Sequence, residues 1–326
     1  MTREPEGEPP AAKRRPGRFT REDIEARTHA FELEFKAQVA VRRAQIDATN
    51  VRIEKATGRN LPVAILIGFG LGGGLLASLL FDKEFFMVFA AGLVGFTSFE
   101  LASVFHFSGR NVPRVPSVIA ALVLVPVSFY GGDSLRWLAM LAAIAFVALW
   151  QLAEFIGRPR SLRALVTDLA AGALIQVYVT FLGTFAVLLT AKPEGQWWTL
   201  TFLVIVVSVD IGAYATGLSV GKHPMAPRIS PKKTWEGFAG SVIAALIAGS
   251  LLALFLLHRP LWVGLVFGAV MVFTATIGDL TESLIKRDLG IKDISTWLPG
   301  HGGFLDRLDS VLPSAAAAYG IYLLLY

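Results

Sequence analysis

Residues 169–191 read LAAGALIQVYVTFLGTFAVLLTA, a stretch of 23 residues without one charged side chain. A helix needs about 20 mostly apolar residues to cross the hydrocarbon core of a bilayer, so this stretch can span a membrane. The composition agrees, because 54% of the 326 residues are hydrophobic and only 17% are charged. Soluble domains average about a quarter charged residues, which excludes a soluble enzyme. The chain has no cysteine, which excludes disulfide scaffolds, thiolate zinc sites and cysteine nucleophiles.

Eight further apolar segments accompany this one, so the sequence predicts an all-α, polytopic integral membrane protein with about nine transmembrane helices. The nine segments are 63–81, 85–107, 117–131, 135–155, 169–191, 198–217, 237–257, 261–280 and 310–326. The third segment is short and contains Pro126, and the last is near the lower limit for a full crossing. Ahead of them, residues 1–60 form a polar tail.

The basic residues are distributed unevenly between the two sides of the membrane. If the tail is cytoplasmic and the segments alternate, the outer connections hold only Lys83, Arg136, Lys192 and Arg259. The other 26 of the 30 Lys and Arg residues are then cytoplasmic. Because Lys and Arg concentrate in cytoplasmic loops, the amino terminus is predicted to be cytoplasmic and the carboxyl terminus outside. The net charge of +5 therefore reflects topology, and no nucleic acid is expected as a partner.

The tail divides into two parts. Residues 1–18 are rich in Pro, Glu and Arg, which predicts disorder. A helical pattern with one apolar stripe follows from Thr20 to about Ala56. We expect this amphipathic helix to pack on the protein's own cytoplasmic face. Binding to anionic lipid and self-association as a coiled coil are the alternatives.

A first polar connection begins inside the sixth segment, where Asp210 follows the apolar run 202–209. An ionisable residue within a span is costly, so Asp210 should face a cavity or a cation. The turn Ser-Pro-Lys-Lys-Thr at 230–234 comes just before a helix, which suits anion binding at a helix N-terminus. The alternative is a basic loop that only sets topology. The candidate binding residues here are Lys222, Ser230, Lys232, Lys233 and Thr234.

A second polar connection follows the eighth segment and carries more charge. Asp279, Glu282, Ser283 and Lys286 have the spacing of one helix face. The stretch PGHGGFLDRLD at 299–309 follows, and its glycines allow backbone amides to approach a ligand closely. Carboxylates beside lysines fit a divalent cation shared with phosphates, since Mg²⁺ usually takes one or two carboxylates plus phosphate oxygens. The alternative is a helix-capping loop held by salt bridges.

One further acidic residue, Glu100, lies within the second segment. Buried carboxylates in a span need hydrogen-bonding partners. We expect a structural hydrogen bond there, with a place in the same cavity as Asp210 as the alternative.

Residues 283–309 resemble the signature of the phosphatidate cytidylyltransferase family, also called CDP-diacylglycerol synthases. That signature reads Ser-x-hydrophobic-Lys-Arg, four residues, Lys-Asp, a short spacer and His-Gly-Gly-x-x-Asp-Arg-x-Asp. Its fixed positions are filled by Ser283, Lys286, Arg287, Lys292, Asp293, His301, Gly302, Gly303, Asp306, Arg307 and Asp309. The stretch 210–237 is also similar to the family, with one departure at Leu218, where the family commonly has a basic residue.

The resemblance implies transfer of a cytidylyl group from CTP to phosphatidate in the bilayer, giving CDP-diacylglycerol and pyrophosphate for phospholipid synthesis. It implies a transmembrane catalytic domain at 61–326, with its motif region at 210–309, in a bacterial cell membrane. It also implies Mg²⁺, with a second cation left open, and in-line attack on the α-phosphorus of CTP at the cytoplasmic surface.

The resemblance also assigns roles to individual residues. Metal ligands are expected at Asp210, Asp279 and Asp306. Catalytic residues are expected at Asp279, Lys286, Arg287, His301, Asp306, Arg307 and Asp309. Substrate-binding residues are expected at Lys222, Ser230, Lys232, Lys233, Thr234, Ser283, Lys292, Asp293, Gly302 and Gly303.

Two other functions compete with this one. A CTP-dependent kinase of a lipid alcohol would transfer the γ-phosphate and release CDP, and its catalytic loops can look similar. A transporter of an anion or a divalent cation would use the intramembrane Asp210. Transporters usually show broken helices in repeated halves, whereas the polar residues here concentrate at one surface. A homodimer is left open.

Overall fold

A computed structural model describes residues 61–157, 161–292, 294, 295, 297, 298 and 302–326, with the backbone alone at 61–65. The tail predicted at 1–60 lies outside the described residues. The described chain is almost entirely helical, in agreement with the predicted class.

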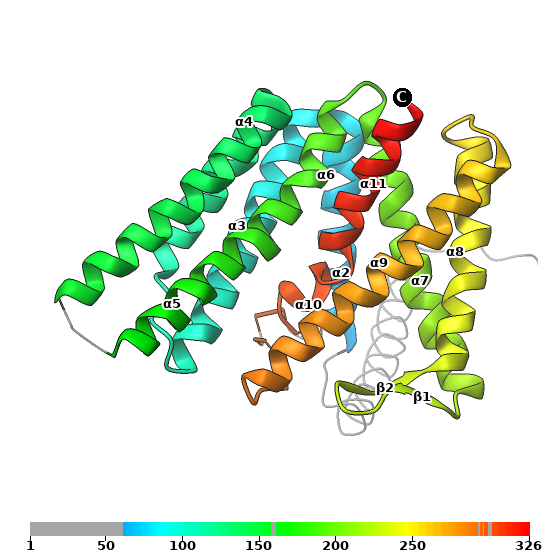
Figure 1. Cartoon of the computed structure of the whole chain (residues 1–326). Coiled ribbons are helices and arrows are strands. Elements are labelled where there is room, and N and C mark those ends of the chain that lie inside the picture. The colour runs from blue at the N-terminus through cyan, green and yellow to red at the C-terminus, as the bar shows by residue number, and fades with distance from the viewer. Residues whose placement is uncertain (1–60, 158–160, 293, 296, 299–301) are drawn as a thin grey trace, which may run out of the picture. The chain divides into compact units, whose positions relative to one another are not determined.

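The helices follow one another with short connections (Figure 1). They are α2 (Leu61–Phe81), α3 (Lys83–Phe107), α4 (Arg114–Gly157), α5 (Leu162–Leu174), α6 (Leu182–Ala191), α7 (Gly195–Val220), α8 (Trp235–Phe255), α9 (Leu261–Asp288), α10 (Leu305–Leu308) and α11 (Val311–Leu325). A π-helical turn, η1 (Ile175–Phe181), joins α5 to α6. Between α7 and α8, β1 (Pro224–Ala226) and β2 (Ser230–Thr234) form an antiparallel hairpin.

Seven helical stretches of the described chain are long and apolar enough to cross a membrane. They are α3, α4, the continuous stretch Leu162–Ala191, α7, α8, α9 and the stretch Leu305–Leu325. A shorter apolar helix, Leu66–Phe81, precedes them. These are the features of a multi-pass membrane protein. The predicted number of nine crossings is not confirmed by this count.

The difference from nine arises partly in α4, which contains two helices that meet at Gly132. Gly132 has φ 66° and ψ −163°, a conformation that glycine adopts readily. Ala120 shares a buried cluster with Ala143 and Val147. On a straight helix Ala120 and Ala143 would lie about 35 Å apart, so the chain turns back near Gly132. The two halves correspond to the predicted segments 117–131 and 135–155.

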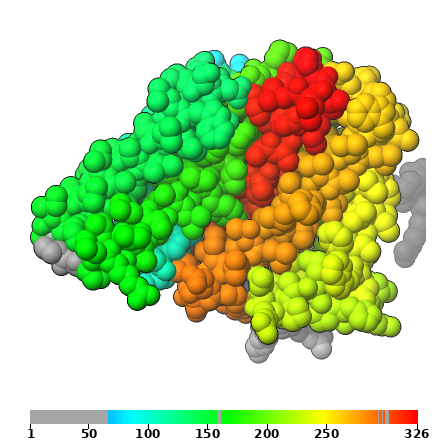
Figure 2. Space-filling view, viewed as in Figure 1, coloured from blue at the N-terminus to red at the C-terminus, as the bar shows by residue number. Residues whose placement is uncertain are grey.

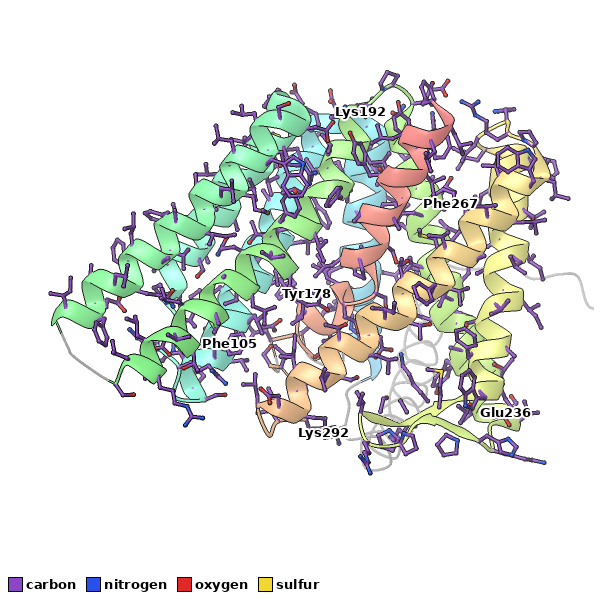
Figure 3. All side chains as sticks on the ribbon, viewed as in Figure 1. Phe105, Tyr178, Lys192, Glu236, Phe267 and Lys292 are labelled. Carbon is purple, nitrogen blue, oxygen red and sulfur yellow. The ribbon has the colours of Figure 1, made fainter. Side chains whose placement is uncertain are left out.

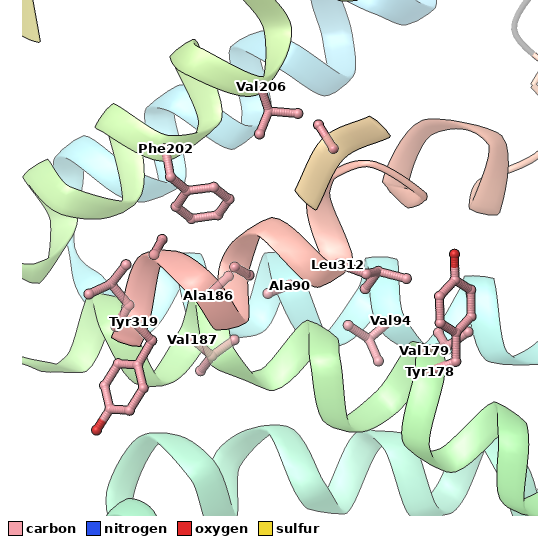
Figure 4. Close-up of a cluster of buried hydrophobic side chains, with 14 of the residues drawn as sticks. Ala90, Val94, Tyr178, Val179, Ala186, Val187, Phe202, Val206, Leu312 and Tyr319 are labelled. Carbon is pink, nitrogen blue, oxygen red and sulfur yellow. The ribbon is translucent and has the colours of Figure 1, made fainter. Parts of the chain in front are cut away.

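The core lies where α3, η1, α6, α7 and α11 meet, and Figure 4 shows its small and branched side chains together. Glycines bring the neighbouring helices α7, α8 and α9 unusually close. A Cβ on Gly212 would lie 2.7 Å from the Gly240 carbonyl oxygen, and one on Gly249 would lie 2.5 Å from that of Gly264. Small residues of this kind let membrane helices pack backbone against backbone. The helices that carry both polar connections are therefore held closely together.

Both polar connections lie at the same end of the helices. Figure 3 places Glu236 and Lys292 toward one end and Lys192 toward the other. In the space-filling view of Figure 2, the hairpin forms the lower edge below α8 and beside the end of α9. Segments far apart in the sequence are thus brought together at one end of the molecule.

Candidate functional site

A cavity of about 410 Å³ lies between α7, the hairpin, α8, α9 and the start of the last helical stretch. The charged residues that line it are Asp210, Lys232, Lys233, Asp279, Asp306, Arg307 and Asp309. Tyr214 and Thr234 also contribute to its wall. The cavity therefore unites the two polar connections that the sequence singled out, and the expectation that Asp210 faces a cavity is confirmed.

Three carboxylates converge on one another at this site. Asp279 and Glu282 are one turn apart on α9, and Asp309 follows α10; one oxygen from each lies within 4.8 Å of the others. The approach requires a glycine at position 278, because a Cβ there would collide with the backbone oxygen of Asp309. We call Asp279, Glu282 and Asp309 the carboxylate cluster.

Within the carboxylate cluster, one side-chain oxygen of Glu282 lacks a hydrogen bond from the described residues. Its side chain is only 2% exposed, and Oε1 has no hydrogen-bond partner among the described residues. A buried polar oxygen left without a hydrogen bond is costly. Convergent carboxylate oxygens with one buried atom unsatisfied are a donor set that suits a hard divalent cation.

Two lysines bind the carboxylates of this site. Lys233 reaches from β2 to α9, where its Nζ lies 2.5 Å from Asp279 Oδ2. Lys286 Nζ lies 2.6 Å from Glu282 Oε2 and 3.1 Å from Asp306 Oδ1. Paired charges of this kind are stable in a poorly solvated interior, whereas breaking one pair leaves a costly buried ion. Lys286 therefore connects the carboxylate cluster to α10.

Asp306 and the glycines before it form a tight local structure. Gly303 N–H donates to Asp306 Oδ2 at 2.7 Å. Gly302 has φ 83°, a left-handed conformation that favours glycine, and it exchanges two backbone hydrogen bonds with Leu298 at 2.9 and 3.0 Å. The backbone conformation accounts for Gly302, and a Cβ on Gly303 would collide with the Glu100 carboxylate, so both glycines have a structural reason. The Gly303 hydrogen bond holds Asp306 beside the cavity.

Glu100 of α3 holds the other side of the same loop. Its carboxylate is buried and accepts hydrogen bonds from Phe304 N–H at 3.1 Å, Leu305 N–H at 2.8 Å and the Ser295 hydroxyl. The Phe304 ring stacks on Phe96 of α3 with centroids 5.2 Å apart. The expectation of a structural hydrogen bond at Glu100 is confirmed, and its role is to anchor the connection that carries Asp306.

The hairpin corrects one expectation about the first polar connection. Residues 230–234 were predicted as a turn that presents lysines at a helix N-terminus, but they form strand β2, paired with β1. Proline is compatible with this because each strand has a free edge. Thr234 ends the strand and caps α8, with its Oγ1 accepting from Gly237 N–H at 3.1 Å. Glu236 accepts from the backbone N–H groups of Lys222 and His223 and so fixes the bend before β1.

The remaining predicted residues lie at different distances from the cavity. Ser283 is buried, and its hydroxyl donates to Asp279 Oδ1 at 3.4 Å. Arg287 Nε donates to the Ile229 carbonyl at 3.2 Å, which ties α9 to the hairpin. Lys222 and Lys292 are exposed, and Ser230 is half-buried; none of the three is among the lining residues of the cavity. Asp293 and His301 lie outside the described residues.

The structure and the sequence differ on which carboxylates group together. The predicted metal ligands Asp210, Asp279 and Asp306 all line the cavity. Among the described residues, however, the only group of three or more whose oxygens lie close enough to share an ion is the carboxylate cluster, which has Asp279 in common with that set. The sequence places Glu282 on the polar face of α9, and its i+3 spacing from Asp279 is the signal that marks it as a candidate ligand.

Comparison with known proteins extends the similarity well beyond the motif region. The cytidylyltransferase family model matches residues 62–325. The phosphatidate cytidylyltransferase of Mycobacterium leprae is 37% identical over 278 residues, which cover 82% of this chain and 89% of that protein. Proteins of the same name from Mycobacterium tuberculosis and Pseudomonas aeruginosa are 35% and 34% identical. They cover 82% and 78% of this chain, and the aligned regions span 84% and 92% of their own lengths.

Proposed function

This chain belongs to the cytidylyltransferase family, and we propose that it transfers the cytidylyl group of CTP to phosphatidate, with release of pyrophosphate. The observation that carries the proposal is the cavity of about 410 Å³, where carboxylates of α7, α9 and α10 face the lysines of the hairpin. It suits a reaction between two polyanions. The names of the relatives supply the substrates, and the cavity supplies a place where both could meet.

The reaction needs positioning and charge neutralisation more than covalent help from the protein. A phosphate oxygen of phosphatidate attacks the α-phosphorus of CTP. The bond from that phosphorus to the oxygen bridging it to the β-phosphorus breaks, and pyrophosphate leaves with the electron pair. Lys232, Lys233 and Arg307 line the cavity and would offset the charge of the phosphates. The attacking phosphate is already ionised, so no general base is assigned.

The donor set of the carboxylate cluster fits Mg²⁺, and we propose Asp279, Glu282 and Asp309 as the residues that would hold it. When bound, Mg²⁺ would supply charge stabilisation to the phosphoryl oxygens. Asp210 and Asp306 line the same cavity and stay proposed ligands of this ion or of a second cation. Lys286 would position Glu282 and Asp306, since it contacts both carboxylates.

Other assignments stay proposals that rest on the family resemblance. They are phosphate binding by Lys222, Arg287 and Lys292, substrate binding by Ser230, Ser283 and Asp293, and a nucleotide or pyrophosphate pocket shaped by His301. We also propose a bacterial cell membrane as the location, with the amino terminus and the site in the cytoplasm, where CTP is, and the carboxyl terminus outside. A homodimer is compatible with this arrangement.

The test is product analysis with the purified full-length protein in mixed micelles. Phosphatidate, Mg²⁺ and CTP labelled in the cytosine ring are supplied, and the label is followed. We expect label in a lipid-extractable product together with an equal amount of pyrophosphate. If the label instead stays aqueous as CDP when a lipid alcohol is added, the protein is a kinase and the proposal is wrong. Absence of CTP turnover with any divalent cation would also overturn it.

A further inference from the structure

A second cavity, of about 580 Å³, lies between α2, α3, α7 and α11. Residues of α10 line it, and residues of α10 also line the cavity of about 410 Å³, which we call the polar cavity. The lining of the second cavity carries no polar side-chain atoms except those of Ser208 and Arg307. The apolar lining includes Leu75 of α2, Phe89 of α3, Leu203 and Val207 of α7 and Leu312 of α11. We call this cavity the apolar groove.

The apolar groove and the polar cavity share one wall residue. Arg307 lines both of them. On α7 the neighbouring residues Asp210 and Ile211 face the polar cavity and the apolar groove respectively. A guanidinium group is suited to bidentate contact with a phosphate. An amphiphile with an anionic phosphate and an apolar chain would match this junction.

The length of the apolar groove matches one leaflet of a bilayer. Its lining on α7 extends from Ile211 to Leu200. Eleven residues of helix rise about 16 Å, whereas half of the hydrocarbon core is about 15 Å. The groove therefore runs from the level of Asp210 toward the Gly195 end of α7, over a length comparable to that of an acyl chain in one leaflet.

We propose that the apolar groove holds one acyl chain of the lipid substrate, with the lipid phosphate at Arg307 and the chain along α7. This inference rests on the proposed function, because phosphatidate is the lipid concerned. Lipid tails are as apolar as the groove, so little affinity is gained by leaving the bilayer. The groove instead orients the lipid. A chain held in the groove also holds the lipid phosphate in position to attack the α-phosphorus of CTP.

Gly72 of α2 provides a direct way to test the groove. It lines the groove, and no atom lies within 4 Å of the position that a Cβ would take. Gly73 has equally open surroundings but is not among the lining residues. Gly72→Leu therefore fills part of the groove, and Gly73→Leu adds the same side chain to the same helix outside it.

The first measurement compares dioctanoyl and dioleoyl phosphatidate as substrates of the full-length protein. For Gly72→Leu we expect kcat/KM to fall about tenfold with the dioleoyl lipid and less than about threefold with the dioctanoyl lipid. The longer chain has methylenes that no longer fit the obstructed groove, and a methylene that does not fit an apolar pocket lowers kcat/KM by about tenfold or more. The KM for CTP should not change. Gly73→Leu should stay within about twofold of wild type with both lipids. Equal losses on the two lipids, equal effects of the two variants or no effect of Gly72→Leu would overturn the proposal.

The second measurement separates this inference from the proposed function. Phosphatidate with a photoactivatable diazirine at the end of one acyl chain is bound without CTP, and labelled peptides are mapped. We expect labels on α2, α7 and α11 that are lost in Gly72→Leu and kept in Gly73→Leu. Labelling of the groove without any cytidylyl transfer would overturn the proposed function but support the groove. Cytidylyl transfer with labels outside the groove would support the proposed function but overturn the groove.

Discussion

Two groups of charged side chains in this helix bundle each contain a deeply buried member, Glu282 in one and Arg136 in the other, and they are built differently. The first is the carboxylate cluster beside the polar cavity. The second, the Arg136 cluster, consists of Asp133 and Arg136 of α4 with Lys192 and Tyr319. Arg136 is only 1% exposed, and its guanidinium carbon lies 4.3 Å from the ring centroid of Phe181 and 3.9 Å from that of Phe185.

Both groups contain atoms without hydrogen bonds, but the surroundings of those atoms differ. Nε and Nη1 of Arg136 have no hydrogen-bond partner within the described part of the chain, yet aromatic faces cover the cation. Asp133 is bound by the Tyr319 hydroxyl at 2.7 Å and by Lys192 at 3.5 Å. Glu282 Oε1, by contrast, belongs to a cluster whose other two members, Asp279 and Asp309, line a cavity.

The comparison shows what distinguishes a structural charge from a functional one in a membrane protein. An intramembrane ionisable residue is by default a functional hypothesis. Here burial and missing hydrogen bonds occur in both groups, so neither feature decides. The adjoining cavity and the convergence of carboxylates decide, because among the described residues the three carboxylates of the cluster face only two lysines and like charges that converge without full compensation are unfavourable. We therefore expect substitutions in the carboxylate cluster to affect catalysis and those in the Arg136 cluster to affect stability alone.

The largest effect is expected for Asp279→Asn. This change removes the carboxylate that belongs to both proposed ligand sets and that pairs with Lys233, while the side-chain volume stays the same. We expect kcat for CDP-diacylglycerol formation to fall by at least about 100-fold, since removal of supporting residues around a metal already costs 10- to 100-fold. The measurement is turnover in mixed micelles at saturating CTP, with Mg²⁺ varied.

The matched control is Asp133→Asn, which makes the same chemical change in the Arg136 cluster. It should keep kcat within about threefold of wild type, because Asp133 is not among the residues lining the polar cavity. Comparable losses in the two variants, with folding intact by gel filtration in detergent, would remove the distinction between the two groups.

An intermediate effect is expected for Glu100→Gln. Glu100 touches neither cavity but accepts the N–H groups of Phe304 and Leu305, so it positions Asp306 and Arg307 through the backbone. An amide keeps one acceptor oxygen and loses the charge, and a hydrogen bond to a charged group contributes about 1.5–3 kcal/mol. We expect about a tenfold loss of kcat with an unchanged Mg²⁺ dependence. A shift in the Mg²⁺ dependence would instead place Glu100 among the metal ligands.

The sequence predicts the helices of this protein better than their contacts. Length and apolar composition alone locate the long helices, because a helix that crosses a bilayer must be long and apolar enough to satisfy its backbone across the hydrocarbon. The spacing of Asp279, Glu282 and Lys286 likewise predicts one face of α9, and these side chains do meet at one site. The hairpin was missed because Ser230-Pro231 reads locally as a turn, whereas its pairing with β1 depends on residues outside that stretch.

The parts of the site that could not be predicted depend on contacts between distant segments. Asp309 joins the carboxylate cluster only because Gly278 lets α9 approach the end of α10. Glu100 is separated by about two hundred residues from the backbone groups that it binds, so its sequence neighbours carry no sign of them. Helix periodicity describes one face of one element and says nothing about which face of another element opposes it.

The smallest effect is expected for Arg136→Met, and it tests the other side of the comparison. Methionine has a similar volume and fills the space between Phe181 and Phe185 without a charge, and thioethers pack well on aromatic rings. Replacing a buried ion by an apolar side chain of similar size is often neutral or stabilising, because the desolvation cost disappears. Asp133 keeps Lys192 and Tyr319 as partners in this variant.

We therefore expect kcat within about twofold of wild type and an unchanged or higher midpoint of thermal unfolding in detergent. Arg136→Ala, which leaves a void instead, should lower that midpoint and still retain turnover. A loss of turnover in Arg136→Met as large as that in Asp279→Asn would show that the two groups are coupled and that the aromatic enclosure does not make Arg136 a structural residue.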